Sequence, residues 1–91
     1  MTVGTSKMLV QPNPFLSSIT VEVMAEQDNQ GIVRLADKHG KIIKMLFWNF
    51  KKGMNITRLS NLDQLANGLY LLDIIDTQGQ VLHKTQLTKE L

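Results

Sequence analysis

Apolar and polar residues alternate along most of this chain with the period of two that is typical of β-strands. The clearest example is the segment 18–26. Its apolar residues Ile19, Val21 and Val23 fall on one face, and mostly polar residues fall on the other. Because the side chains of a strand point alternately to its two faces, this segment is predicted to be a half-buried strand.

Six further segments are predicted to be strands, and turn-forming residues separate them about every 8–12 residues. These segments are 8–10, 32–37, 41–50, 54–59, 69–76 and 80–88. The segment 60–63 resembles a helix start, but little more than one turn fits before Gly68, so we expect a short helical turn or an irregular loop. The whole pattern predicts an all-β fold, namely a small immunoglobulin-like β-sandwich of about seven antiparallel strands.

The strand that begins after Asn67-Gly68 is predicted to lie in the interior of the sandwich. The run 69–75 is almost continuously apolar, which is typical of a strand without a fully solvated face. The chain has to reverse direction immediately before it, and glycine adopts a positive φ without steric cost. We therefore expect a positive φ at Gly68.

Two turns share one pattern, Asp37-Lys38-His39-Gly40 and Asp76-Thr77-Gln78-Gly79. An aspartate at the first position accepts hydrogen bonds from the turn's own backbone, and a glycine at the last position suits a left-handed residue. Both segments are predicted to be hairpin loops. The repeat could reflect an internal duplication. The favoured explanation is that any hairpin with this loop length selects Asp and Gly at these two positions.

The composition is that of one small globular domain. The 91 residues are 43% hydrophobic, carry a formal charge of +2 and include no cysteine. Disulfides and thiolate metal sites are therefore excluded, and no apolar run is long enough to span a membrane. Residues 1–7 are mostly small and polar, lack the apolar core of a signal peptide, and are interpreted as a linker remnant. Residues 8–91 are predicted to form the single domain.

No pattern for catalysis, metal binding or cofactor binding emerges from the polar residues. Neither His39 nor His83 has a carboxylate or serine at a recognisable catalytic spacing, so both are interpreted as solvated or structural. Asp37 and Asp76 each bring one carboxylate to a loop, whereas calcium needs six or more oxygen ligands, so both are interpreted as turn residues. We expect neither catalytic residues, nor a metal, nor a cofactor.

Two surface features leave binding functions open. Phe47 and Trp48 are neighbours on one predicted strand, so they point to opposite faces and one of them is expected to be exposed. An exposed aromatic can bind sugars, but with five aromatic residues in the chain a covered edge or a protein contact is favoured. The lysines between positions 38 and 52 are interpreted as a solvated surface or as edge protection, without a nucleic-acid partner.

Several short motifs in order make the chain resemble a known family. These are Pro12-Asn13-Pro14-Phe15, the turn from Asp37 to Gly40, Gly53-x-Asn55-Ile56, Leu65-x-x-Gly68-x-Tyr70, the turn from Asp76 to Gly79, and a terminal strand with Lys84 and Lys89. Over residues 8–89 the sequence resembles the type A C-terminal sorting domain of the type IX (Por) secretion system of Bacteroidetes. It departs from the family pattern at Gln11 and at its Glu90-Leu91 ending.

The resemblance implies a function that residue chemistry does not reveal. Such a domain is a secretion signal on an upstream cargo protein and is not an enzyme. Its partners are the outer-membrane translocon and the surface sortase, and it is exported through the periplasm to the cell surface or beyond. The resemblance links recognition to the last strand, with Lys84 and Lys89 as candidates, and we expect a monomer. The alternative is an immunoglobulin-like accessory module of a secreted enzyme or adhesin that binds carbohydrate or protein.

Overall fold

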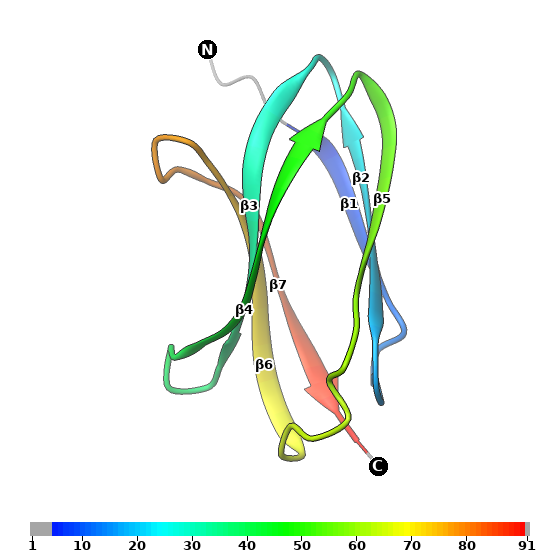
Figure 1. Ribbon diagram of the computed structural model, residues 1–91, viewed down its shortest axis with the longest axis vertical. Coiled ribbons are helices and arrows are strands. Elements are labelled where there is room, and N and C mark those ends of the chain that lie inside the picture. The colour runs from blue at the N-terminus through cyan, green and yellow to red at the C-terminus, as the bar shows by residue number, and fades with distance from the viewer. Residues whose placement is uncertain (1–4, 91) are drawn as a thin grey trace.

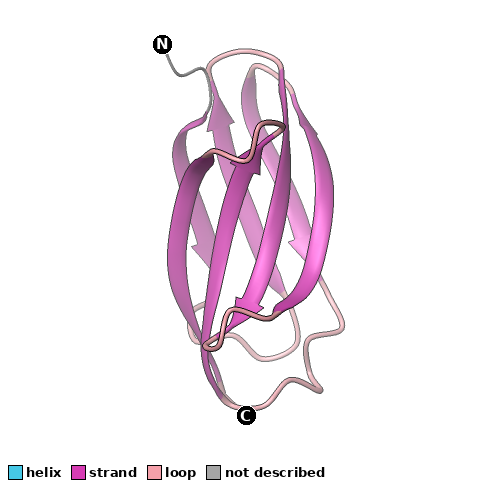
Figure 2. Ribbon diagram, turned by 90° about the vertical axis from the view of Figure 1, so that its left-hand side faces the viewer, coloured by secondary structure: helices cyan, strands magenta, loops and turns pink. Residues whose placement is uncertain are grey.

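Seven antiparallel strands form two sheets that pack face to face in the computed structural model, which describes residues 5–90 (Figure 1). One sheet has three strands in the order β1-β2-β5, and the other has four in the order β4-β3-β6-β7. Figure 2 shows the two layers, and residues 5–90 form no helix. The all-β sandwich prediction is confirmed. The strands are β1 (Thr5–Gln11), β2 (Ile19–Ala25), β3 (Asn29–Asp37), β4 (Ile42–Phe50), β5 (Gly53–Leu59), β6 (Gly68–Asp76) and β7 (Val81–Lys89).

The core lies between the sheets, where the predicted alternation places its apolar side chains. On β2 the side chains of Ile19, Val21 and Val23 are fully buried, while the intervening residues are half-buried. Val33 and Leu35 of β3 are also fully buried, as predicted. Because inner-face side chains of both sheets fill one layer between them, the inner strands β2, β3 and β6 bury every second residue along most of their length.

Several strand bounds differ from the prediction. β1 begins at Thr5 instead of Met8, and β3 begins at Asn29, within a segment whose polar residues predicted a turn. Asn29 is paired in register with Phe50 of β4. Cross-strand pairing therefore extends the sheet through residues whose own β propensity is low, because a strand's length depends on its partner as well as its composition.

The prediction for β6 is correct on one face only. Tyr70, Leu72 and Ile74 are buried, but Leu69 on the other face is 41% exposed. β6 lies between β3 and β7, and those neighbours shield the outward residues Leu71 and Ile75 only in part. An inner strand of a two-layer sandwich is covered on a single face, so its outer side chains meet solvent even when they are apolar.

β1 starts and β7 finishes at opposite ends of the sandwich (Figure 1). We call the end at which β7 finishes the motif end, and it comprises the loops 12–18, 38–41 and 60–67 with the last residues of β7. The loop 60–67 is irregular. The sequence predicted either such a loop or a short helical turn at this position. Leu62 closes the core at this end with 1% exposure, and its amide donates to the carbonyl of Ser17 at 2.9 Å.

Candidate functional site

The Pro12–Phe15 segment joins the beginning of the domain to its last strand. The amide of Phe15 donates to the carbonyl of Thr88 at 2.9 Å, and the amide of Glu90 donates to the carbonyl of Phe15 at 3.0 Å. The side-chain oxygen of Asn13 accepts from the amide of Thr88 at 3.0 Å. Phe15 itself is fully buried. The segment therefore lies along the outer edge of β7 near its end and satisfies backbone groups there.

Phe15 and Tyr70 bring the first and fourth of the motif pieces into contact. Their rings meet edge to face, with centroids 5.9 Å apart. The Tyr70 hydroxyl donates to the carbonyl of Ala66 at 2.7 Å, across the turn that leads into β6. A tyrosine at the start of this strand, bonded to backbone a few residues upstream, is the tyrosine corner of immunoglobulin-like sandwiches.

Gly68 lies inside that corner. Its φ is +139°, which confirms the predicted positive value. A Cβ atom at this position would meet nothing within 4 Å, so the requirement for glycine concerns backbone conformation and not space.

The Asp37 turn has the predicted hydrogen bonds. One carboxylate oxygen of Asp37 accepts from the amides of His39 at 2.8 Å and Lys41 at 2.9 Å, and the amide of Gly40 donates to the Asp37 carbonyl at 3.0 Å. Gly40 has a φ of +86°. The bond from the Lys41 amide is the main cause that lowers the pKa of the Asp37 carboxyl, assisted by the His39 amide and by the nearby charges.

This turn borders a shallow hollow of about 260 Å³ at the motif end. The hollow lies between the turn and the start of β6, and its lining is Asp37, Lys38, His39, Ala66, Asn67, Gly68, Leu69 and Tyr70. The structure thus brings together the motif pieces at 12–15, 37–40 and 68–70, which are far apart in the sequence.

The second turn of the same pattern lies at the other end of the molecule (Figure 1). One Asp76 carboxylate oxygen accepts from the amides of Gln78 at 2.9 Å and Gln80 at 2.8 Å, and Gly79 has a φ of +85°. Both hairpin predictions are therefore confirmed. Asp76 and Gly79 are therefore motif residues that lie outside the motif end. The two turns have similar geometry because hairpin loops of the same length require the same backbone conformation.

The two candidate recognition lysines differ in accessibility. Lys84 is exposed on the outer face of β7, where it is paired in register with Asp73. Lys89 is 1% exposed and is paired in register with Gly68, so the folded domain does not present its side chain to a partner. Sequence alone did not reveal this burial, because lysine is rarely buried and the burial here depends on pairing with a segment distant in the chain.

The other polar candidates form no cluster. Among residues 5–90, no three His, Cys, Asp or Glu side chains lie close enough together to hold a metal ion. His39 is exposed in its turn, whereas His83 is half-buried on β7. On the outer face of the four-stranded sheet, Arg34 donates to Asp73 at 2.9 and 2.7 Å, and these bonds raise the pKa of Arg34.

The exposed aromatic of β4 is Phe47, with 80% of its surface accessible. Trp48 points the other way, is half-buried, and packs on Phe50 with ring centroids 4.7 Å apart. The expectation that one of the two neighbours is exposed is confirmed. A single exposed phenylalanine lacks the neighbouring coplanar rings of a sugar-stacking platform.

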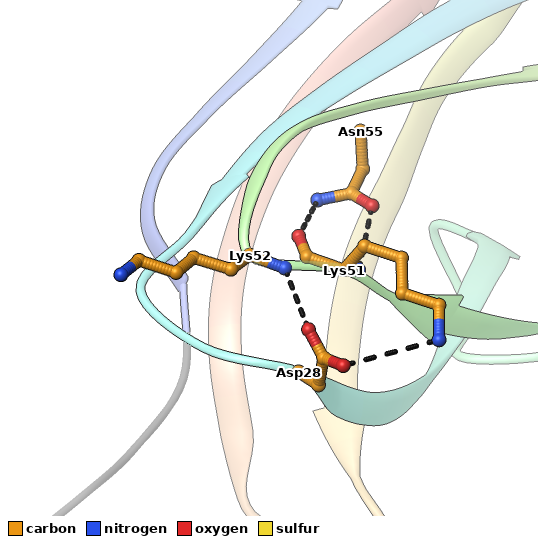
Figure 3. Close-up of polar contacts among 4 residues, drawn as sticks. All are labelled: Asp28, Lys51, Lys52 and Asn55. Atoms are coloured by element: carbon orange, nitrogen blue, oxygen red, sulfur yellow. Dashed lines mark hydrogen bonds and ion pairs between the residues drawn. The ribbon is translucent and has the colours of Figure 1, made fainter.

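Two loops are tied together at the end opposite the motif end (Figure 3). One Asp28 carboxylate oxygen accepts from the amide of Lys52 at 2.9 Å, which links the loop before β3 to the loop after β4. The side chain of Asn55 both accepts from the amide of Lys51 at 2.9 Å and donates to its carbonyl at 2.8 Å. These contacts give Asn55 of the Gly53-x-Asn55 piece a structural role, since its side chain bonds to backbone groups of a tight turn.

Solved structures share the fold at low sequence identity. The chain resembles a GH3 β-glucosidase of Bifidobacterium adolescentis over 97% of its length, with a TM-score of 0.57 and 10% identity. It resembles a β-glucosidase of Kluyveromyces marxianus over 96%, with a TM-score of 0.54 and 12% identity. A β-glucosidase of Listeria innocua matches over 99%, with a TM-score of 0.55 and 13% identity. The chain spans 14–17% of the lengths of these proteins, and the likeness shows the fold alone.

A search of curated proteins gives no match to this chain. No helix within residues 5–90 has the length and hydropathy of a membrane span.

The comparison with protein families is more specific. The model of the secretion system C-terminal sorting domain matches residues 9–89, which include the motif end and every motif piece named above. The chain therefore belongs to this family, whose members are secretion signals of the type IX system and direct export to the cell surface or the extracellular space.

Proposed function

We propose that the outer-membrane translocon of the type IX system recognises this domain at the motif end and along β7, and that the surface sortase then processes the cargo joined to it. The observation that carries the proposal is the gathering of three motif pieces at one end, against the last strand. β1 starts at the opposite end, so a cargo domain attached there leaves the motif end accessible.

The domain acts in this proposal as a rigid signal with no catalysis of its own. Its buried apolar layer and its backbone clamps fix the shape of the motif end, while its polar side chains serve turns and loop contacts. Lys84 is the proposed contact residue of β7, because it is exposed on the outer face. The proposed domain is residues 8–91 with a linker at 1–7, but β1 pairs from Thr5, so a fusion should carry all 91 residues.

The test is a reporter fusion in a bacterium with a working type IX system. The reporter carries an export signal peptide, and the 91 residues follow it at the C-terminus. We expect the reporter at the cell surface or in the medium. Retention in the periplasm, in a strain that secretes its own cargo normally, would contradict the proposal.

The role of Lys84 is tested by Lys84→Gln in that fusion, with Lys7→Gln as the matched control. Both lysines are exposed on strands, and they lie in different sheets. We expect secretion to fall with Lys84→Gln alone, while both variants melt like the parent domain. Equal secretion of the two variants would show that the machinery does not read this side chain.

A further inference from the structure

β4 is an edge strand whose outer side has no partner among the described residues. It pairs with β3 on one side and ends the four-stranded sheet on the other. At the opposite edge of the same sheet, the Phe15 segment lies on part of β7. An open edge presents a row of backbone donors and acceptors that another strand can join. An additional strand can therefore pair with the sheet along the β4 edge.

Exposed apolar side chains accompany that open backbone. They are Ile42 at 44%, Ile43 at 37%, Met45 at 51% and Phe47 at 80% exposure. Apolar side chains that gather on an exposed surface often mark an interaction site. A joining strand would cover part of this surface with its own alternate side chains.

Charge decides between the candidate partners. The segment 38–52 carries five lysines and no carboxylate, whereas the rest of the chain carries five basic and eight acidic residues. Lys41 and Lys51 flank β4 directly, and both are exposed. Each flanking lysine has one carboxylate nearby. The Asp28 carboxylate lies 3.9 Å from the Lys51 ammonium, but both side chains are mostly solvated, so this pair neutralises little. The charge of Lys41 is one of the smaller causes that lower the pKa of Asp37, and five lysines in the segment still outnumber these two carboxylates.

A second copy of the chain fits this charge pattern poorly. Antiparallel pairing of two β4 strands about a two-fold axis would set Lys41 of one copy near Lys51 of the other, at both ends of the interface. Like charges directly opposite each other destabilise a strand pair. A strand with acidic residues at its ends would instead meet opposite charges at both ends.

We propose that the β4 edge binds an extended acidic segment of a partner protein, which joins the four-stranded sheet as a fifth strand. The partner segment has apolar or β-branched residues at alternate positions and Asp or Glu at its ends. This inference goes beyond the proposed sorting function, because β4 lies across the sheet from β7.

The probe is a labelled nine-residue peptide with alternating valine and threonine and two glutamates at each end. Its binding to the 91-residue domain is measured by fluorescence anisotropy. One control peptide has lysines in place of the glutamates, and a second has a proline at its centre. We expect the acidic peptide to bind at least about tenfold more tightly than the basic one, and more weakly at higher salt. The proline peptide should lose binding, because proline removes a ladder donor.

The matched variants are Lys41→Glu with Lys51→Glu on the β4 edge, and Lys7→Glu with Arg58→Glu elsewhere. Both pairs change the net charge equally. The β4 pair should weaken binding of the acidic peptide about tenfold, whereas the control pair should leave it within about twofold. A melting curve for each variant establishes that it is folded.

Several results would overturn the proposal. They are equal binding of the acidic and basic peptides, undiminished binding of the proline peptide, equal effects of the two variant pairs, and no binding of the acidic peptide up to about 1 mM. Self-association through β4 in sedimentation experiments would assign the edge to a second copy. Binding to phosphatidylglycerol vesicles that depends on Phe47, without peptide binding, would assign it to a membrane surface.

Discussion

The backbone of Phe15 is hydrogen-bonded to the backbone of Thr88, so the middle of the first loop and the end of the last strand close the sandwich together. Asn13 strengthens this closure, because its side chain accepts from the amide of Thr88 and donates to the carbonyl of Gln86. The family-like Pro12–Phe15 segment therefore acts as a clamp on β7. Its contribution to stability and its contribution to sorting can be measured separately.

Asn13→Ala removes the side-chain part of the clamp. We expect the free energy of unfolding to fall by about 1 kcal/mol, because a 3.0 Å and a longer 3.5 Å hydrogen bond to backbone are lost at an exposed site. Urea denaturation measures this loss. Gln64→Ala, another exposed loop residue at the motif end, is the control and should change the midpoint little. Equal midpoints for the two variants would show that the Asn13 bonds add no stability.

Tyr70→Phe tests the tyrosine corner. The ring stays in contact with Phe15, while the 2.7 Å bond from the hydroxyl to the Ala66 carbonyl is lost. We expect a loss of about 0.5–1.5 kcal/mol in the free energy of unfolding, which is the range for one net hydrogen bond. Chemical denaturation with an unchanged m-value would attribute the loss to the folded state. An unchanged free energy would mean that water replaces the hydroxyl without cost.

The parts of the fold that depend on local chemistry could be predicted from the sequence. The alternation around Val21 predicts which face is buried, and Asp37 with Gly40 predicts a turn, because both depend on residues close in the chain. The positive φ of Gly68 could also be predicted, because it depends on the local reversal of the chain. A tyrosine two residues after that glycine was also an available signal for the corner, although it indicated only a structural residue.

The parts that depend on distant segments could not be predicted. The bridge from Phe15 to the end of β7 joins the two ends of the chain, and no local pattern encodes it. The burial of Lys89 follows from that bridge and from pairing with Gly68. Similarly, the strand pattern says that Phe47 and Trp48 point oppositely, but only the packing of the second sheet decides which one is exposed.

Gly31 and Gly68 are needed for different reasons, which their alanine variants should separate. At Gly31 a Cβ would lie 2.7 Å from Cε2 of Phe50 and 3.1 Å from the carbonyl oxygen of Ile75. We expect Gly31→Ala to cost about 1–3 kcal/mol through overpacking. Combination with Phe50→Leu, which removes the nearer atom, should recover part of that cost when compared with Phe50→Leu alone.

Gly68→Ala should cost about 1–3 kcal/mol as well, but through its φ of +139° in open space. No substitution of a neighbour should recover that loss, because the strain is in the backbone. Thermal or chemical denaturation of Gly68→Ala with and without Phe50→Leu measures this, and additive effects are expected. Recovery of Gly68→Ala by Phe50→Leu would contradict the distinction between the two glycines.

The Asp37 turn should make stability depend on pH in the acid range. Its hydrogen bonds to the amides of Lys41 and His39 lower the carboxyl pKa in the folded state, so folding favours the ionised form. The resulting stabilisation is complete above the ordinary aspartate value of about 3.9 and is lost as the pH falls through the lower pKa of the folded state. Asp37→Asn keeps an oxygen acceptor for the turn but cannot ionise.

At neutral pH the melting temperature of the parent domain should therefore be higher than that of the Asp37→Asn variant. The difference between the two melting temperatures should become smaller as the pH falls below about 4. Melting curves of both proteins across that range measure the effect, and the difference between them cancels the titration of the other carboxylates. A direct NMR titration of the Asp37 carboxyl carbon gives the folded pKa independently. A difference in melting temperature that stays constant with pH, or a carboxyl that titrates at its ordinary value, would show that the turn's amides do not stabilise the charge.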